Sequence, residues 1–124
     1  MSFRHLIAVC AAAVIAATAS FAQADVAAGK KVFKKCKACH TVNKGGKKRI
    51  GPNLFGIVGR KAGMSEGFKY SKAMKNSGIM WDDANLDGFI KKPRKFMKGT
   101  KMSFGGIKKE QQRKDLIAYL KTLK

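Results

Sequence analysis

The clearest periodic pattern of apolar residues lies near the C-terminus, between Lys108 and Leu123. Apolar side chains recur there at intervals of three and four, at Leu116, Ile117, Leu120 and Leu123. Lys and Gln occupy many of the other positions. Residues with this spacing share one face of an α-helix. The pattern therefore predicts a helix with one buried stripe.

A second apolar pattern at helical spacing runs from Asp25 to Lys35, and its members are Val26, Gly29, Val32 and Phe33. Asp25 stands directly before it, where an N-cap residue is expected. A glycine on the apolar face suggests that another helix approaches closely. We expect the C-terminal helix to pack there.

Two further helices are predicted in the second half of the chain. Ser71 to Asn76 can form a brief helix that ends at Gly78. Asp82 or Asp83 caps a longer helix, and Pro93 is expected to stop it. The inward side chains of this longer helix are Leu86, Phe89 and Ile90.

Long segments without a period separate these helices. Residues 41–63 contain Pro52 and several glycines, and residues 98–106 contain three more glycines. No stretch alternates like a β-strand, and no repeat is present, so we predict one all-α domain with long loops. Loops of this length need a reason, and a buried prosthetic group that they enclose supplies one.

The first 24 residues read as a cleavable secretory signal peptide. Arg4 gives a positive start, residues 6–19 form an apolar run, and Ala22-Gln23-Ala24 is a small-residue cleavage site. We expect cleavage before Asp25, export to the periplasm, and a domain comprising residues 25–124. An uncleaved membrane anchor is the alternative, although the run is shorter than the about 20 residues that span a bilayer.

The charge of the chain is strongly positive. The chain of 124 residues carries 27 Lys and Arg against 7 Asp and Glu, a net charge of +20, and removal of the signal leaves 100 residues at +19. Such an imbalance implies an acidic partner surface, a polyanion or an anionic membrane, with association that weakens as salt rises. It does not discriminate among them.

The candidate chemistry lies in Cys36-Lys37-Ala38-Cys39-His40, a C-x-x-C-H motif typical of covalent haem c attachment. Each thiol can form a thioether to one vinyl group, and the adjacent imidazole can bind the iron. A zinc site would need four Cys or His ligands, and a redox dithiol would need a βαβ context. Both alternatives lack support in this sequence.

The second axial ligand is less clearly marked. His40 is the only histidine after residue 24, so a bis-histidine haem within one subunit is excluded, which leaves Met, Lys, water or an open position. Most methionines are core filler. Met102 differs, because it lies in a glycine-flanked loop between two helices.

Five segments together resemble class I cytochrome c, close to mitochondrial cytochrome c and the bacterial cytochrome c2 group. The resemblance spans nearly all of residues 25–124. It rests on Cys36-Lys37-Ala38-Cys39-His40-Thr41, Gly51-Pro52-Asn53-Leu54-Phe55-Gly56, Gly59-Arg60-Lys61, Gly99-Thr100-Lys101-Met102-Ser103-Phe104 and Asp115-Leu116-Ile117-Ala118-Tyr119-Leu120.

The resemblance implies His40 and Met102 as iron ligands, with the Pro52 carbonyl accepting the second imidazole N–H. It implies that Phe104 shields the haem edge. It also implies that a further group surrounds the haem propionates, namely Arg60, Tyr70, Ser71, Trp81 and Thr100. Phe89 and Met74 replace polar residues of the mitochondrial pattern, which predicts a drier pocket beside the Met102 sulfur.

The function implied is a one-electron carrier in the periplasm and not an enzyme. The partners implied are acidic faces of a quinol-oxidising cytochrome complex and of a terminal oxidase or photosynthetic reaction centre, with transient contact to the membrane surface. We expect a monomer. The docking cations implied are Lys31, Lys35, Arg49, Arg94, Lys95, Lys101, Lys108 and Lys109.

Two other functions stay open at this stage. A haem peroxidase or gas-binding protein would need a vacant sixth position at the iron. A basic module for nucleic acid or a membrane surface is favoured by charge alone. Export and the lack of an interleaved aromatic and basic stripe argue against nucleic acid.

Overall fold

The structure is a computed structural model that describes residues 10–13 and 23–124. The predicted signal peptide, residues 1–24, lies for the most part outside the described residues, and Cys10 within it is exposed and free. Among the described residues, no helix combines the length and the hydrophobicity of a bilayer span.

Short helices supply the regular structure of the described chain, and the predicted all-α architecture with long loops is confirmed. Its single β-type contact is an isolated bridge between Lys61 and Met80. The helical elements are α1 (Val26–Val32), a 3-10 turn (Phe33–Lys35), α2 (Lys72–Asn76), α3 (Asp83–Lys91), α4 (Pro93–Phe96) and α5 (Glu110–Lys121).

Three helices begin at side-chain caps, of which those at Asp25 and Asp82 were predicted, whereas Ser71 was expected inside its helix and caps it instead. Asp25 accepts the Ala28 amide at 3.1 Å, Ser71 accepts the Met74 amide at 3.1 Å, and Asp82 accepts the Asn85 amide at 2.8 Å. Each cap satisfies one of the backbone donors that a first helical turn leaves free. Local sequence therefore fixes these three starts.

The prediction that Pro93 stops the preceding helix is confirmed, because α3 ends at Lys91. Pro93 also begins α4, a short helix that was not predicted. Proline fits a first helical turn, because its missing N–H is not needed there and its φ is already helical. The Met97 amide closes the turn on the Pro93 carbonyl at 2.9 Å. Helix α5 is also two residues shorter at each end than predicted.

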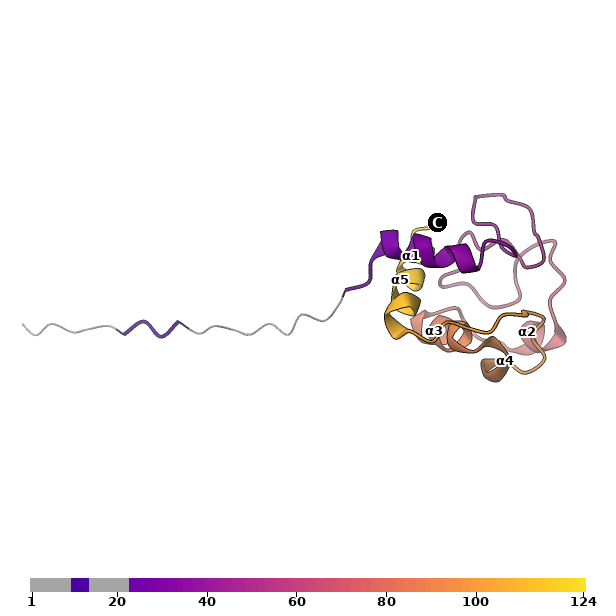
Figure 1. Cartoon of the computed structure of the whole chain (residues 1–124). Helices are drawn as coiled ribbons and strands as arrows, with labels where there is room; N and C mark the ends of the chain where they lie inside the picture. Colours follow the sequence, from indigo (N-terminus) through magenta and orange to yellow (C-terminus); the bar gives the residue numbers. More distant parts are fainter. Residues whose placement is uncertain (1–9, 14–22) are drawn as a thin grey trace, which may run out of the picture.

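Helices α1 and α5 cross at one end of the domain, while the loops close around the opposite side (Figure 1). The glycine at position 29 makes the crossing possible, because an added Cβ would overlap the Asp115 carbonyl of α5. Phe33 packs on Tyr119 with ring centroids 5.7 Å apart, and Leu116 is 2% exposed. The predicted packing of the first helix on the last is confirmed.

Arg113 ties α5 to α3 and to the segment before α5. Its Nε donates to Asp87 at 2.7 Å, and its Nη1 donates to the carbonyls of Ile107 and Lys108 at 3.0 and 2.7 Å. Arg113 is buried, so these charge-assisted bonds matter more than a surface pair would. The α1–α5 crossing is thereby anchored to α3.

Substituting Gly29 should weaken the domain through this crossing. In Gly29→Ala the new Cβ meets backbone that cannot turn aside, and such overpacking typically costs about 1–3 kcal/mol of unfolding free energy. Thermal melting should show a drop of about 4 °C or more. Gly105→Ala adds the same atom into open space and should leave the melting temperature nearly unchanged. Equal melting temperatures for the two variants would contradict the account.

Candidate haem-binding site

The C-x-x-C-H motif forms a tight turn directly after the 3-10 turn that extends α1. The amides of Cys39 and His40 both donate to the Cys36 carbonyl, at 3.1 and 3.0 Å. Both thiols are half-buried and free, and His40 is 8% exposed. The two candidate tethers and the candidate ligand are thus held on one hydrogen-bonded turn.

The loop after the turn holds the imidazole of His40. Its Nδ1 lies 2.8 Å from the Pro52 carbonyl, to which it donates, and this leaves Nε2 as the lone-pair nitrogen. Gly51 lies against the ring so closely that an added Cβ would overlap it, and the Gly51 amide donates to Cys39 at 2.8 Å. One tautomer and one ring position are therefore favoured, as a metal ligand requires.

Burial shapes the proton affinity of this cluster. Burial lowers the pKa of His40, against the opposing effect of its bond to Pro52, so the imidazole is held in the neutral form that binds metals. Burial raises the pKa of Cys36 to about 11, with Cys39 adding to the shift and Lys35 opposing it. A redox dithiol needs the reverse, a lowered thiol pKa.

Hydrogen bonds join the segment that carries Pro52 to the residues that follow His40. Asn53 donates from Nδ2 to Thr41 Oγ1 at 2.8 Å and to the Asn43 carbonyl at 3.0 Å. The Leu54 amide donates to the Thr41 carbonyl at 2.8 Å, and Thr41 Oγ1 donates to Lys47 at 2.8 Å. These bonds hold the Pro52 carbonyl in place beneath the imidazole.

Arg60 carries unpaired donors inside the domain. Its Nε and Nη2 are buried with no hydrogen-bond partner among the residues that the structure describes, and Nη1 donates to the Phe55 carbonyl at a long 3.4 Å. The backbone around it pairs with Trp81, whose amide donates to the Arg60 carbonyl at 2.9 Å. A buried guanidinium without an acceptor is costly. A carboxylate such as a haem propionate is the acceptor that it fits.

The hydroxyl groups predicted near the propionates also retain donor capacity. Tyr70 Oη accepts the Ser65 amide at 3.1 Å, Ser71 Oγ accepts the Met74 amide, and Thr100 Oγ1 accepts the Met102 amide at 3.3 Å. Each oxygen acts as an acceptor in these bonds, so its own O–H can still be donated. These three residues and Arg60 together offer donors suited to anionic groups.

Met102 and the other predicted pocket residues surround the same hydrophobic core. Trp81 is 5% exposed and packs on Phe89 with ring centroids 5.1 Å apart. Met74 is buried in this core as well, and Met102 and Phe104 are half-buried against it. Met74 and Phe89 place only apolar groups there, and the drier pocket beside Met102 stays a prediction.

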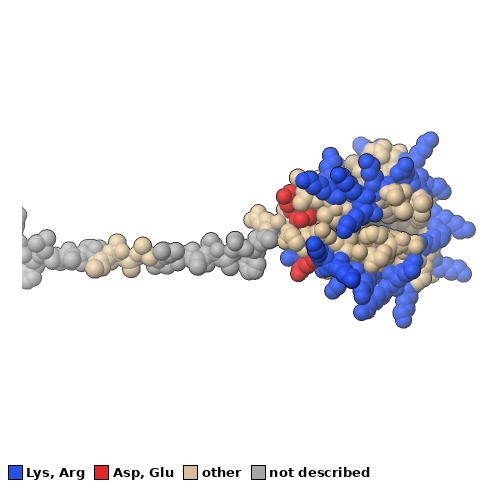
Figure 2. Space-filling view, viewed as in Figure 1, with Lys and Arg blue, Asp and Glu red and all other residues tan. Residues whose placement is uncertain are grey.

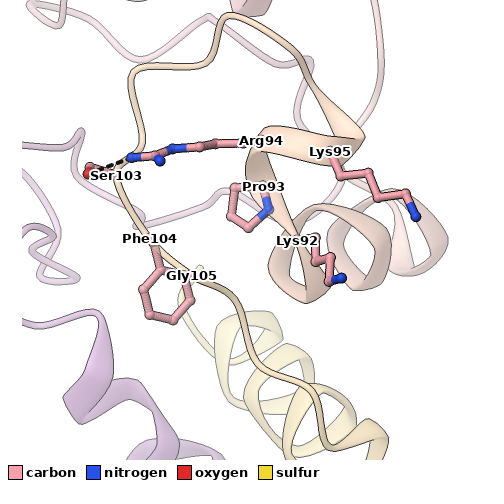
Figure 3. A pocket seen from close by; sticks show the side chains of 7 residues that line it. All are labelled: Lys92, Pro93, Arg94, Lys95, Ser103, Phe104 and Gly105. Carbon is pink, nitrogen blue, oxygen red and sulfur yellow. Dashed lines mark hydrogen bonds between the residues drawn. The ribbon is translucent and has the colours of Figure 1, made fainter.

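A basic hollow of about 350 Å³ opens beside the loop that carries Met102. Figure 3 shows its walls, with Pro93 and the cations of α4 on one side and Phe104 on the other. Arg94 reaches across it, and its Nη2 donates to Ser103 Oγ at 2.9 Å. The loop with the candidate sulfur ligand thus reaches the surface among positive charges.

Sequence reasoning did not identify two contacts of the site. The room that Gly51 leaves for the imidazole was missed, although a glycine directly before the predicted acceptor Pro52 was an available signal. The bond from Arg94 to Ser103 was also missed, and no local pattern could have indicated it.

The arrangement fits haem better than the alternatives. The chain offers two free thiols that can form thioether tethers, a neutral ring nitrogen, and unpaired Arg60 donors suited to a carboxylate, which are the groups that a haem would need. Zinc is not favoured, because residues 10–13 and 23–124 contain no cluster of three or more Cys, His, Asp or Glu side chains suited to a metal ion.

Comparison with known proteins gives the same result. The family model described as "Cytochrome c" matches residues 26–124. Cytochrome c of Theileria annulata is 55% identical over 100 residues, which cover 80% of this chain and 86% of that protein. Cytochrome c2 of Rhodomicrobium vannielii is 46% identical over 116 residues, covering 94% and 93% of the two chains.

The fold comparison points the same way. The structure of cytochrome cH from Methylobacterium extorquens superimposes with a TM-score of 0.75 at 47% identity, covering 79% of this chain and 98% of that one. The chain belongs to the cytochrome c family, so it binds haem c covalently through Cys36 and Cys39 and serves as an electron carrier.

Proposed function

We propose that this chain is a periplasmic one-electron carrier, exported by residues 1–24 and cleaved before Asp25. It takes electrons from a quinol-oxidising cytochrome complex and delivers them to a terminal oxidase or a photosynthetic reaction centre. The bound haem supplies the one-electron redox couple. The observation that carries the proposal is the His40 imidazole, fixed by Pro52 and Gly51 with Nε2 free.

His40 and Met102 are the axial ligands in this proposal. His40 is fixed as described above, and its bond to Pro52 raises the basicity of the ring. Met102 is delivered by a loop whose start is held by the Thr100 bond and whose end is held by the Arg94 bond to Ser103. With both axial positions filled by protein, no position remains for a substrate, so we expect no enzymatic turnover.

Arg60 and its neighbours control the environment of the redox couple. Arg60, Tyr70, Ser71 and Thr100 would donate to the propionates of a bound haem and so compensate their negative charges. Trp81 and Phe104 contribute apolar surface that excludes water. A low local dielectric disfavours the additional positive charge of the oxidised state, so the midpoint potential should be high for a haem.

Charge segregation supports docking through one basic face. Acidic side chains gather at the end of the domain where the N-terminal segment joins, and basic side chains are spread over the rest of the visible surface among uncharged ones (Figure 2). A net charge of +19 on residues 25–124, spread in this way, orients the domain in the field of an acidic partner. Lys92, Arg94 and Lys95 surround the hollow at Phe104, where we place the contact.

A substitution at Gly51 tests the support of His40. In Gly51→Ala the new Cβ overlaps the imidazole, which must shift away from Pro52. We expect an altered visible spectrum in at least one oxidation state and a melting temperature lowered by about 4 °C or more. Gly105→Ala serves as the control. A spectrum and stability like those of the unsubstituted protein would show that Gly51 does not position the ring.

A substitution at Met102 tests the proposed sulfur ligand. Met102→Ala should abolish the weak far-red absorption band that iron–thioether bonding gives in the oxidised protein, and the variant should bind added cyanide readily. Met64→Leu changes a methionine that is 60% exposed and should retain the band. If Met102→Ala keeps the band, another residue ligates the iron. If the unsubstituted protein lacks the band, the peroxidase or gas-binding alternative gains support.

Neutralising single lysines tests the proposed docking face. Lys35→Gln and Lys101→Gln should each lower the second-order rate of electron transfer to an acidic partner complex by about two- to fivefold at low salt. The midpoint potential should hardly change, and the rate difference should vanish as salt rises. Lys114→Gln removes the same charge from a residue paired with Glu110 at 3.4 Å near the acidic end. An equal loss of rate in this control would argue against the docking face.

A further inference from the structure

Asp115 is the one buried carboxylate among the described residues, at 7% exposure, and no basic side chain there lies within 4.0 Å of it. Three other carboxylates, on α3 and α5, differ in this respect, because each has a cation. Asp87 pairs with Arg113 at 2.7 Å, Glu110 with Lys114 at 3.4 Å, and Asp83 with Lys121 at 2.7 Å. In a chain with 27 Lys and Arg, the most buried carboxylate has no cation.

The bonds that Asp115 does receive come from neutral amides. Its Oδ1 accepts the backbone N–H of Asp25 at 2.9 Å and the Nε2 of Gln111 at 2.9 Å. Removing a carboxylate from water is expensive unless an opposite charge compensates it. Two neutral donors compensate only part of that cost, so a cation at this place would add stabilisation.

The missing charge can arise from the chain itself. The nitrogen that donates to Asp115 belongs to Asp25, the residue that becomes first if the signal is removed after Ala24. Hydrolysis adds one water across the Ala24–Asp25 amide, which leaves a carboxylate on Ala24 and an amine on Asp25. That amine takes up a proton at neutral pH, because an α-amino group ordinarily titrates near about 7.7–8.0.

We propose that processing places the new α-ammonium group of Asp25 on the buried carboxylate of Asp115, as a charged clamp between α1 and α5. This inference rests on the proposed cleavage before Asp25. The hydrogen bond from a neutral N–H to the carboxylate thereby becomes an ion pair at the same two atoms, without movement of either helix. Asp115 is a positioning residue for the α1–α5 crossing and takes no part in electron transfer.

The surroundings favour a positive charge at this place. Ala24 lines a hollow of about 390 Å³ with the carboxylates of Asp83, Asp87 and Glu110, and with the amines of Lys114 and Lys121. The Asp25 side chain accepts the Ala28 amide at 3.1 Å and adds another carboxylate nearby. The group is partly exposed, so solvent screening keeps the effect modest.

A pair of exported holoproteins tests the clamp. One begins at Asp25. The other carries Gly-Ser inserted between Ala24 and Asp25, which restores an amide at Asp25 and moves the ammonium away without changing the net charge. Mass spectrometry of each purified protein establishes its first residue. Thermal melting is then followed from pH 6 to 9.5, in both proteins and in their Asp115→Asn forms.

We expect the protein that begins at Asp25 to melt about 3–8 °C above the extended protein at pH 6 to 7. Pairing raises the pKa of the α-amino group in the folded state, so its contribution is complete below the unfolded pKa and is lost as pH rises through the folded pKa. The difference should therefore shrink above about pH 8. It should also be absent between the Asp115→Asn forms.

Equal melting temperatures at pH 6 to 7, or a difference that persists undiminished at pH 9.5, would overturn the clamp. If Asp115→Asn does not fold, the pH dependence of the first pair decides alone. A mass that shows another first residue would overturn the cleavage proposal. The clamp would then be decided by the same pair made behind a leader whose removal leaves Asp25 first.

Discussion

The hydrogen bond between the His40 imidazole and the Pro52 carbonyl is the constraint around which the site is arranged. It selects the tautomer that presents Nε2 to a metal, and burial keeps the ring neutral. The loop that supplies the carbonyl has little regular structure, so side-chain bonds from Asn53 and Thr41 give it rigidity. Gly51 leaves the space in which the ring lies. The His40 imidazole is therefore held rigidly within a loop-rich chain. Cys36 and Cys39, which attach the haem covalently, lie on the same turn.

The two ends of the domain have different tasks and opposite charge. At one end, α1 and α5 cross at Gly29, and carboxylates paired with Arg113, Lys114 and Lys121 surround the crossing. Stability comes from there. Basic residues are spread over the rest of the visible surface among uncharged ones, and Lys92, Arg94 and Lys95 line the hollow beside Phe104. Electron exchange and docking fit this second region, so charges that stabilise the crossing do not compete with those that attract a partner.

The sequence predicted whatever depends on local chemistry. The motif at Cys36, the caps at Asp25 and Asp82, and the stripe of α5 are each readable from neighbouring residues, and the structure contains the caps and the helix. Pro93 correctly marked the end of α3, but α4 was missed, because a proline can both end one helix and start the next. Three features could not be predicted from sequence: the unpaired donors of Arg60, the bond from Arg94 to Ser103, and the lack of a cation beside Asp115. Each depends on side chains brought together from distant positions.

We infer that a haem is held covalently by Cys36 and Cys39, and we propose that His40 and Met102 ligate its iron. A visible spectrum of the purified protein in both oxidation states tests this most directly. We expect the sharp bands of a low-spin c-type haem in the reduced state and the weak far-red band of iron–thioether bonding in the oxidised state. After denaturation the colour should stay with the polypeptide, because the haem is covalently attached. A colourless protein, or an oxidised spectrum typical of a high-spin iron with one open face, would contradict it.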